Sequence, residues 1–410
     1  MDPSALTDSQ VVLGITLIIA VATACQMVAP RLRVPALVLL LPAGFVLGIL
    51  VPGADAQEFL GPAFGPIVDL TVAIILFQGG IELGRLGVER RDRRTASRLV
   101  WFGGPITWGA ATLCGMFLLG FPTSLALLFG AIVVVSGPTV VGPILSYVKP
   151  EARLRNLLTY EGVFLDPLGA LLAVILFQGI KAGQAASASD AILTFLGGLG
   201  VAVVAAAIGA LLIRYGVRFV GPGRAMGSQV ILGVVVLMVG LANTVTDDAG
   251  LLAALLMGLA VVRISRRFGR EEQVASAQPI MSTFVTMAVG VLFVALSALV
   301  TPESLLPLLG PAIGTAAILI LVVRPAMAFL MTMGSQMSWQ ERMFVGWMAP
   351  RGIVAAATAA SIATTLVSLR IPGAEDLLPV VFTVITVTVL VYGLTAAPMA
   401  KALGVQAGDT

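Results

Sequence analysis

Charged side chains are scarce in this sequence of 410 residues: only 11% of the residues are Asp, Glu, Lys or Arg, and 58% are hydrophobic. A soluble protein carries about 25% charged residues. The mean hydropathy of +1.04 is correspondingly high. This composition excludes ordinary soluble domains and indicates a polytopic membrane protein.

Histidine is absent and cysteine occurs only twice, as Cys25 and Cys114. No imidazole is therefore available as a metal ligand, proton shuttle or pH sensor. Both cysteines fall within apolar stretches, which excludes a disulfide framework and a cysteine-based metal site. Because the sequence also shows no phosphate-binding loop and no nucleophile–base pair, it predicts neither an enzyme nor a bound cofactor. Its basic residues lie in short loops, where membrane topology explains them without nucleic acid.

Apolar stretches follow one another along the whole chain, and the positions of the basic residues give them a direction. Twenty of the 24 basic residues lie after odd-numbered stretches, whereas the loops after even-numbered stretches hold only Lys181 and Arg370. Since basic loops remain cytoplasmic, this predicts an outside N-terminus and an inside C-terminus, in a bacterial inner membrane. We mark thirteen stretches, at residues 10–29, 34–51, 66–83, 99–120, 124–147, 157–180, 190–213, 228–243, 249–264, 279–300, 305–334, 341–369 and 376–402.

The odd number of stretches suggests two inverted six-helix repeats within one transmembrane domain, residues 1–410. The repeats would cover about residues 10–180 and 228–402, with a linker helix at about 190–213. The fifth and twelfth stretches correspond in this scheme, and both are interrupted, by Ser136-Gly-Pro-Thr-Val-Val-Gly-Pro143 and by Ala349-Pro-Arg-Gly352. Interrupted helices in corresponding positions point to a binding site at the membrane midplane. The predicted fold is all-α, with crossed and broken helices.

Two carboxylates lie inside the sixth stretch, where an ionisable group costs ~2.5–3.5 kcal/mol on insertion scales. Asp166 is followed by Pro167, which frees backbone carbonyls nearby. We therefore predict that Asp166 binds a monovalent cation or a proton. Glu161 is about 140° away around the helix, so the two do not form a shared-proton pair. We predict instead that Glu161 forms a structural ion pair with Arg324.

Four further polar residues are candidates for the same site. Arg351 lies in the twelfth-stretch interruption, where its charge can offset the negative ends of half-helices. Ser136 and Thr139 lie in the fifth-stretch interruption, and their hydroxyls are candidate ligands for a cation or proton. Gln78, in the third stretch, can support the site by hydrogen bonding across helices.

In order and spacing, these motifs resemble the monovalent cation:proton antiporter superfamily, specifically its NhaP-like sodium/proton exchanger branch. The resemblance covers nearly the whole chain. It implies a homodimer with an inverted-repeat fold and crossed, partly unwound helices in a mobile core. It also implies that Asp166 binds the ion or the proton, and that Glu161 pairs with Arg324. The motifs are Ile74-Ile-Leu-Phe-Gln-Gly-Gly80, Ser136-Gly-Pro-Thr-Val-Val-Gly142, Glu161-Gly-Val-Phe-Leu-Asp166, Arg324-Pro325 and Ala349-Pro-Arg-Gly-Ile353.

Three positions depart from the family pattern. Leu165 stands where relatives carry Asn or Asp, Gly162 where they carry Ser, and Gly137 where many carry Asp. Backbone carbonyls, Ser136, Thr139 or water must therefore replace the missing side-chain ligands. Because Leu165 cannot titrate, we expect electroneutral exchange of one cation for one proton.

We expect a secondary antiporter that works by alternating access, with Na⁺ as the first candidate cation and K⁺ or Li⁺ as alternatives. Membrane lipids and a second copy of the chain are the expected partners. A solute symporter and a cation channel on the same scaffold remain alternatives. An intramembrane aspartyl protease would need a second deep aspartate, which we do not find. Relatives often carry a cytosolic ligand-sensing domain after the last span, and we expect that such a regulatory domain is missing from this chain.

Overall fold

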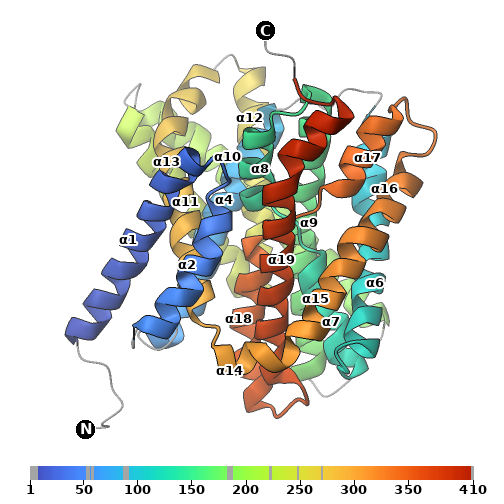
Figure 1. The fold of residues 1–410 in the computed structure, drawn as a ribbon. Coiled ribbons are helices and arrows are strands. Elements are labelled where there is room, and N and C mark those ends of the chain that lie inside the picture. The colour runs from blue at the N-terminus through green and yellow to red at the C-terminus, as the bar shows by residue number, and fades with distance from the viewer. Residues whose placement is uncertain are drawn as a thin grey trace.

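The computed structural model describes residues 8–51, 56, 60–85, 92–181, 188–220, 224–246, 249–268 and 271–407. Over these residues it is helical, with no strand beyond an isolated bridge between Pro150 and Gln406 (Figure 1). The all-α fold expected from the sequence is confirmed.

The longer helices are α1 (Asp8–Leu32), α2 (Leu37–Leu50), α4 (Phe64–Arg85), α6 (Gly104–Phe117), α7 (Thr123–Val134), α8 (Pro138–Val148), α9 (Ala152–Lys181), α10 (Ala188–Val220), α11 (Arg224–Val245), α12 (Ala249–Arg267), α13 (Glu271–Ala298), α15 (Leu309–Ile318), α16 (Arg324–Thr332), α17 (Trp339–Trp347), α18 (Ile353–Ser368) and α19 (Ala374–Leu403). Short helical segments precede or join them: η1 (Gly61–Ala63), α5 (Arg93–Arg98), η2 (Leu99–Gly103), α14 (Pro302–Leu305), η3 (Leu306–Leu308) and η4 (Leu319–Val323).

Nine helices within the described ranges are long and apolar enough to cross a membrane, and α2, α7 and α18 are shorter apolar helices. Several helices extend beyond the apolar stretches, because a helix can continue past the hydrocarbon layer into charged residues. α9 already begins at Ala152, and α10 continues to Val220. The count of thirteen spans and the repeat and linker boundaries stay predictions.

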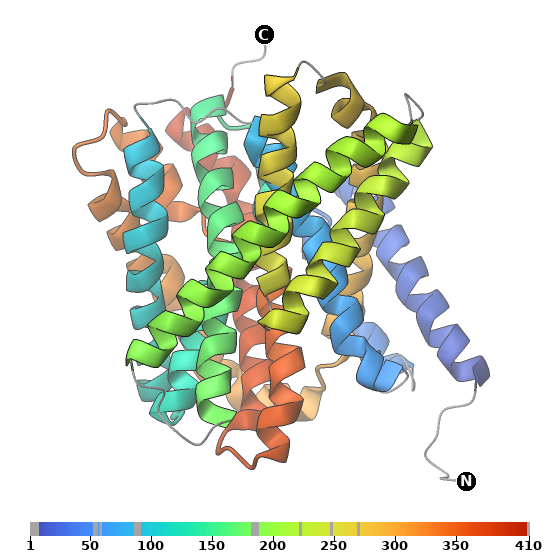
Figure 2. The same cartoon turned by 180° about the vertical axis from the view of Figure 1, so that it is seen from behind.

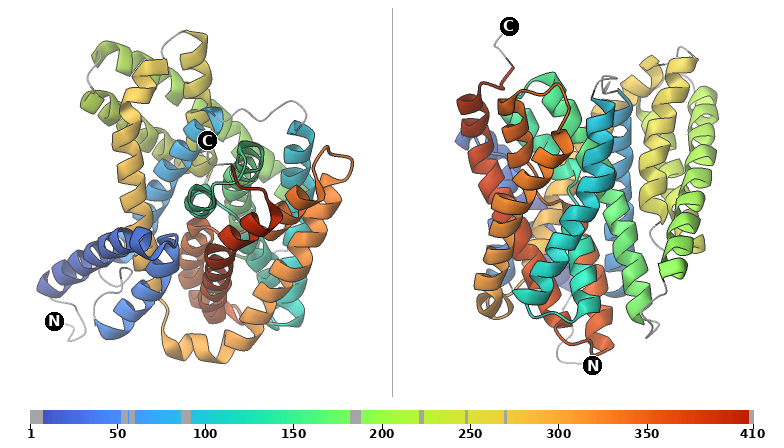
Figure 3. Two further views of the ribbon diagram at one scale, coloured as in Figure 1. Left: turned by 45° about the horizontal axis from the view of Figure 1, so that its top comes forward. Right: turned by 90° about the vertical axis from the view of Figure 1, so that its right-hand side faces the viewer.

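The helices form two packed groups (Figure 3). Helices α1, α2 and α10–α13 lie on one side, α5–α9 and α15–α19 lie on the other, and α4 contacts both. The long helix α10 runs obliquely across the back of the molecule and packs against α9, α11 and α12 (Figure 2). Glycines allow α4 and α12 to approach each other closely. A β-carbon added at Gly80 would overlap the carbonyl oxygen of Leu255, and one at Gly258 would overlap that of Phe77.

Two widened, π-type turns occur in the fourth and eleventh predicted stretches, which correspond in the repeat scheme. They are η2 and η4, and each is followed closely by a proline, Pro105 or Pro325. A proline ring clashes with the carbonyl four residues earlier, and the widened turn relieves this clash. The paired irregularities favour the predicted repeat relationship.

We call the end of the molecule where the C-terminus lies, at the top of Figure 1, the C-terminal face. The turn from α8 into α9, the start of α17 and the end of α19 all lie at this face. Arg153, Arg342 and Lys401 belong to these segments, so these basic residues lie at one end of the bundle, as the alternation along the sequence predicts.

Candidate cation and proton site

Two helix breaks meet inside the second group of helices. Residues 135–137 separate α7 from α8, and residues 348–352 separate α17 from α18. Gly137 and Gly352 have extended backbones and immediately precede α8 and α18. A β-carbon added at Gly352 would lie only 2.9 Å from the backbone nitrogen of Gly137. The breaks therefore touch backbone to backbone, an approach that the two glycines permit.

Asp166 of α9 lies at this crossing and is completely buried. A β-carbon on Gly137 would overlap its carboxylate, and one on Gly352 would lie 3.4 Å from Oδ1. The carboxylate thus faces the first residues of α8 and α18, where helix dipoles are positive. Among the groups that the structure describes, neither Oδ1 nor Oδ2 has a hydrogen-bond partner. Both oxygens remain available for a cation or a proton.

Pro167 does not break α9, which remains helical from Ala152 to Lys181. Proline has no N–H, so the carbonyl of Val163, four residues earlier, lacks its usual donor within the helix. The expected release of a carbonyl near Asp166 therefore concerns one turn of an intact helix rather than a third break.

Glu161 and Arg324 form a buried, bidentate ion pair. Arg324 Nη2 lies 2.9 Å from Glu161 Oε2, and Nη1 binds Oε1. Arg324 Nε also donates to the carbonyl oxygen of Val345, at 3.1 Å, near the end of α17. The pair therefore connects α9 with α16 and α17, one turn from Asp166.

Arg351 has the matching position at the other break. Its Nη1 donates to the carbonyl oxygen of Val134 at 3.2 Å, and its backbone N–H donates to Thr388 Oγ1 at 3.3 Å. Val134 is the last residue of α7, so the buried guanidinium of Arg351 lies at the negative end of that half-helix. The two half-helices that end at the crossing, α7 and α17, each give a terminal carbonyl to a buried arginine.

The remaining candidates lie in different surroundings. Ser136 is buried in the first break. The side chain of Thr139 lies outside the described residues. Gln78 of α4 lines a cavity of about 420 Å³ between α1, α2, α4, α8 and α13, and its Oε1 has no partner among the described groups. Polar side chains of Gln26, Glu82, Ser146, Ser282 and Thr286 also line this cavity, and among the side chains that the structure describes no Lys or Arg does so.

The model of the transmembrane sodium/hydrogen exchanger family matches residues 16–402, which is nearly the whole chain. The chain belongs to this family. It is 27% identical over 393 residues to the K⁺/H⁺ antiporter NhaP2 of Shewanella sp. strain MR-4, covering 94% of this chain and 66% of that protein. This family member thus spans about two thirds of the length of these curated relatives.

Shorter relatives match over more of their length. The probable Na⁺/H⁺ antiporter 2 of Methanocaldococcus jannaschii is 25% identical over 402 residues, covering 92% of this chain and 93% of that protein. The fold is that of the sodium proton antiporter MjNhaP1 from the same organism, solved at pH 8. That structure superposes with a TM-score of 0.82 at 22% identity, covering 96% of this chain and 98% of the other. The antiporter fold predicted from the sequence is confirmed.

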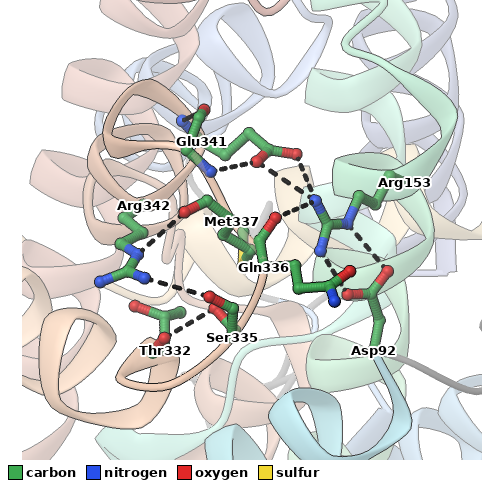
Figure 4. A network of polar contacts seen from close by, with 9 residues as sticks. Asp92, Arg153, Thr332, Ser335, Gln336, Met337, Glu341 and Arg342 are labelled. Atoms are coloured by element: carbon green, nitrogen blue, oxygen red, sulfur yellow. Dashed lines mark hydrogen bonds and ion pairs between the residues drawn. The ribbon is translucent and has the colours of Figure 1, made fainter.

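Sequence reasoning missed a polar network at the C-terminal face (Figure 4). Arg153 of α9 binds both carboxylate oxygens of Asp92, at 2.9 and 2.7 Å, and Oε1 of Glu341, at 3.0 Å. It also donates to the carbonyl oxygen of Gln336 at 3.1 Å. Glu341 in turn forms a capping box with Ser338 at the start of α17. The Ser338-Trp-Gln-Glu341 pattern was a readable signal for this helix start, but nothing local pointed to Arg153.

Proposed function

We propose that the chain is a secondary antiporter that exchanges a monovalent cation for H⁺ across the membrane, with Asp166 as the residue that binds each in turn. One observation carries this proposal above all: Asp166 is fully buried, faces two helix N-termini and has no hydrogen-bond partner among the described groups. An unneutralised carboxylate is unfavourable in such a place. Either a proton or a cation can neutralise it, and one carboxylate cannot hold both.

Exclusive occupancy of this kind couples the two fluxes without a covalent step. In the proposed cycle, Asp166 faces each side of the membrane alternately and crosses only in a neutral form. That form is the protonated acid in one direction and the carboxylate with its cation in the other. We propose that the cavity beside Gln78 is the approach from the C-terminal face, because its described lining offers acceptor oxygens and no cationic side chain.

The supporting residues have distinct proposed roles. Glu161 and Arg324 hold α9 against α16 and α17, and Arg351 stabilises the end of α7. Backbone carbonyls of the first break, Ser136 and Thr139 are the proposed further ligands. Gln78 is the proposed polar support in the approach to the site.

We propose Na⁺ as the first candidate cation, since relatives named as Na⁺/H⁺ antiporters match over most of their length. K⁺ is the second candidate, because the relatives with the higher identities are named as K⁺/H⁺ antiporters. The positions of the basic residues favour an outside N-terminus and a cytoplasmic C-terminus in a bacterial inner membrane. We further propose a homodimer surrounded by lipid. The cytosolic regulatory domain remains an expectation from the family resemblance.

The test is cation-driven proton movement in proteoliposomes, with Li⁺, Na⁺, K⁺ and Rb⁺ compared in the same vesicles. We expect a pH change with Na⁺, with K⁺, or with both, and in every case none for Asp166→Asn. A passive channel would instead carry current without moving protons, and a solute symporter would move protons only when its solute is present. A protein that inserts correctly and gives no cation-driven pH change with any of the four would refute the proposal.

A further inference from the structure

After α19, residues 404–407 turn back onto the bundle. Gly404 has a left-handed backbone, with φ of +67°, and Val405 N–H donates to the carbonyl oxygen of Ala400 at 3.1 Å. This is the usual glycine-dependent helix ending. The side chain of Val405 is then buried, with 3% of its surface exposed. We call residues 404–407 the tail clip.

The tail clip hydrogen-bonds to the short loop between α8 and α9. Glu151 N–H donates to the carbonyl oxygen of Val405, and Ala407 N–H donates to that of Lys149, both at 2.9 Å. Gln406 Nε2 donates to the carbonyl oxygen of Val148 at 3.2 Å. Val148 is the last residue of α8, so the glutamine satisfies one of the carbonyls that a helix end leaves without an intrahelical donor.

The same loop leads directly into the Arg153 network. Arg153 is in the first turn of α9 and binds Asp92, just before α5, and Glu341, in the first turn of α17 (Figure 4). The α8–α9 loop therefore connects two sets of hydrogen bonds, those of the tail clip and those of Arg153, and together they hold the outer ends of α8, α9 and α17.

The inner parts of all three helices contribute to the candidate site. α8 has 11 residues and is therefore about 16 Å long. Its inner end begins next to Gly137, which packs on Asp166. Because α8 has only about three turns, a shift at its outer end displaces its inner end, even though Pro143 removes one hydrogen bond within it. Lys149, which joins α8 to the loop, has a positive φ of 52°, a conformation that costs energy for a residue other than glycine. The hydrogen bonds of the clip hold this turn.

We propose that the tail clip is a positioning element of the transport site: through the α8–α9 loop it fixes the inner end of α8 against Asp166. This inference rests on the proposed function and extends it to residues that contact neither cation nor proton. Cation affinity is then set in part from the C-terminal face.

Ala407 offers a matched pair of variants for the test. Ala407→Pro removes the N–H that donates to Lys149, whereas Ala407→Ser keeps it. We expect Ala407→Pro to raise the cation KM of proton exchange about fivefold, the size of effect that one lost hydrogen bond allows. Ala407→Ser should match the wild type. A purely structural contribution would lower the yield or Tm of folded protein and leave the KM of each folded protomer unchanged.

A disulfide provides the rescue. Pro150 and Gln406 face each other as an antiparallel pair without mutual hydrogen bonds. Such pairs have Cα atoms about 4.5 Å apart, within disulfide range. In a chain with Cys25 and Cys114 replaced by alanine, Pro150→Cys/Gln406→Cys should show a raised KM when reduced and a wild-type KM when oxidised. Oxidation should also restore the Ala407→Pro variant. If Ala407→Pro does not insert into the membrane, the test is the KM of oxidised against reduced Pro150→Cys/Gln406→Cys, in which Ala407 is retained.

Equal KM values for Ala407→Pro and Ala407→Ser, or a disulfide whose closure leaves the KM unchanged, would overturn the inference while leaving the proposed function intact. An inhibited oxidised protein would also overturn it, because the clip would then have to open during transport. A wild-type chain that exchanges no cation would instead refute the proposed function, and this inference with it.

Discussion

Glu161 and Asp166 lie on the same helix, five residues apart, and both are buried, yet their surroundings are opposite. Glu161 is held by both terminal nitrogens of Arg324. Asp166 faces glycines and the starts of two half-helices, with no hydrogen-bond partner in the described part of the chain. Their neighbours in the fold, rather than their depth in the helix, make the difference.

This difference in surroundings indicates different roles for the two carboxylates, one structural and one in transport. A carboxylate paired on both oxygens with an arginine is already neutralised, and breaking the pair leaves a buried charge. A carboxylate without a partner is energetically unfavourable in the same environment until it binds a cation or a proton. We therefore propose a structural role for Glu161 and a transport role for Asp166. The following predictions test these two roles.

The largest expected effect is on transport. Asp166→Asn should abolish cation-coupled proton movement, because an amide cannot exchange a proton or neutralise a cation. Proteoliposome fluxes measure the loss, and size-exclusion profiles in detergent check that the variant is folded. Near-normal exchange by a folded variant would remove Asp166 from the site.

Stability should respond in the opposite way. Glu161→Ala and Arg324→Ala should each destabilise the protein by about 3–5 kcal/mol, since each leaves an uncompensated buried charge. Asp166→Asn should change Tm much less. The double variant Glu161→Ala/Arg324→Ala should recover part of the loss. Thermal unfolding in detergent measures these differences. Single variants as stable as the wild type would show that the ion pair does not hold these helices together.

A smaller effect is expected from crowding the unpaired carboxylate. Gly137→Ala places a methyl group against Asp166, whereas a β-carbon at Gly142, on the same half-helix, meets nothing within 4 Å. Overpacking costs about 1–3 kcal/mol, so Gly137→Ala should weaken cation affinity by about tenfold or more. Gly142 lines the cavity beside Gln78, whose volume of about 420 Å³ leaves room for a methyl group, so Gly142→Ala should leave the KM of exchange unchanged. Equal KM values for the two variants would argue against a site at the crossing.

Membrane potential should have the smallest effect. If Glu161 stays paired and Leu165 cannot titrate, Asp166 alone carries charge and crosses the membrane neutral in both directions. Clamping vesicles with K⁺ and valinomycin should therefore change the rate of Na⁺-driven pH change less than about twofold, because a neutral carrier does no work against the potential. A steep acceleration would reveal a second titrating group.

Much of this arrangement was predictable from local sequence. The two interruptions showed in the Gly-Pro steps at Gly137-Pro138 and at Pro350-Arg351-Gly352, because proline and glycine act on the backbone where they stand. The depth of Asp166 followed from the length of the apolar stretch around it. These features depend on neighbours along the chain, which a sequence shows directly.

Other features depend on contacts between distant parts of the chain and could not be predicted from the sequence. The expectation that Arg351 lies at a negative helix end was general, but its contact with the carbonyl of Val134 requires the second break to lie across the first. Arg153 counted only as one basic residue of a loop, although it joins Asp92 and Glu341 across 61 and 188 positions of the sequence. The tail clip likewise depends on backbone groups that every residue carries.

The claim that cation and proton occupy Asp166 in turn has a direct test without vesicles. Cation is added to purified protein in weakly buffered detergent solution, at a pH where the site is protonated, and the released protons are counted. We expect about one proton released per protomer at saturating cation, with none released by Asp166→Asn and wild-type release by Gly142→Ala. Saturable cation binding without proton release, or release that persists undiminished in Asp166→Asn, would contradict it.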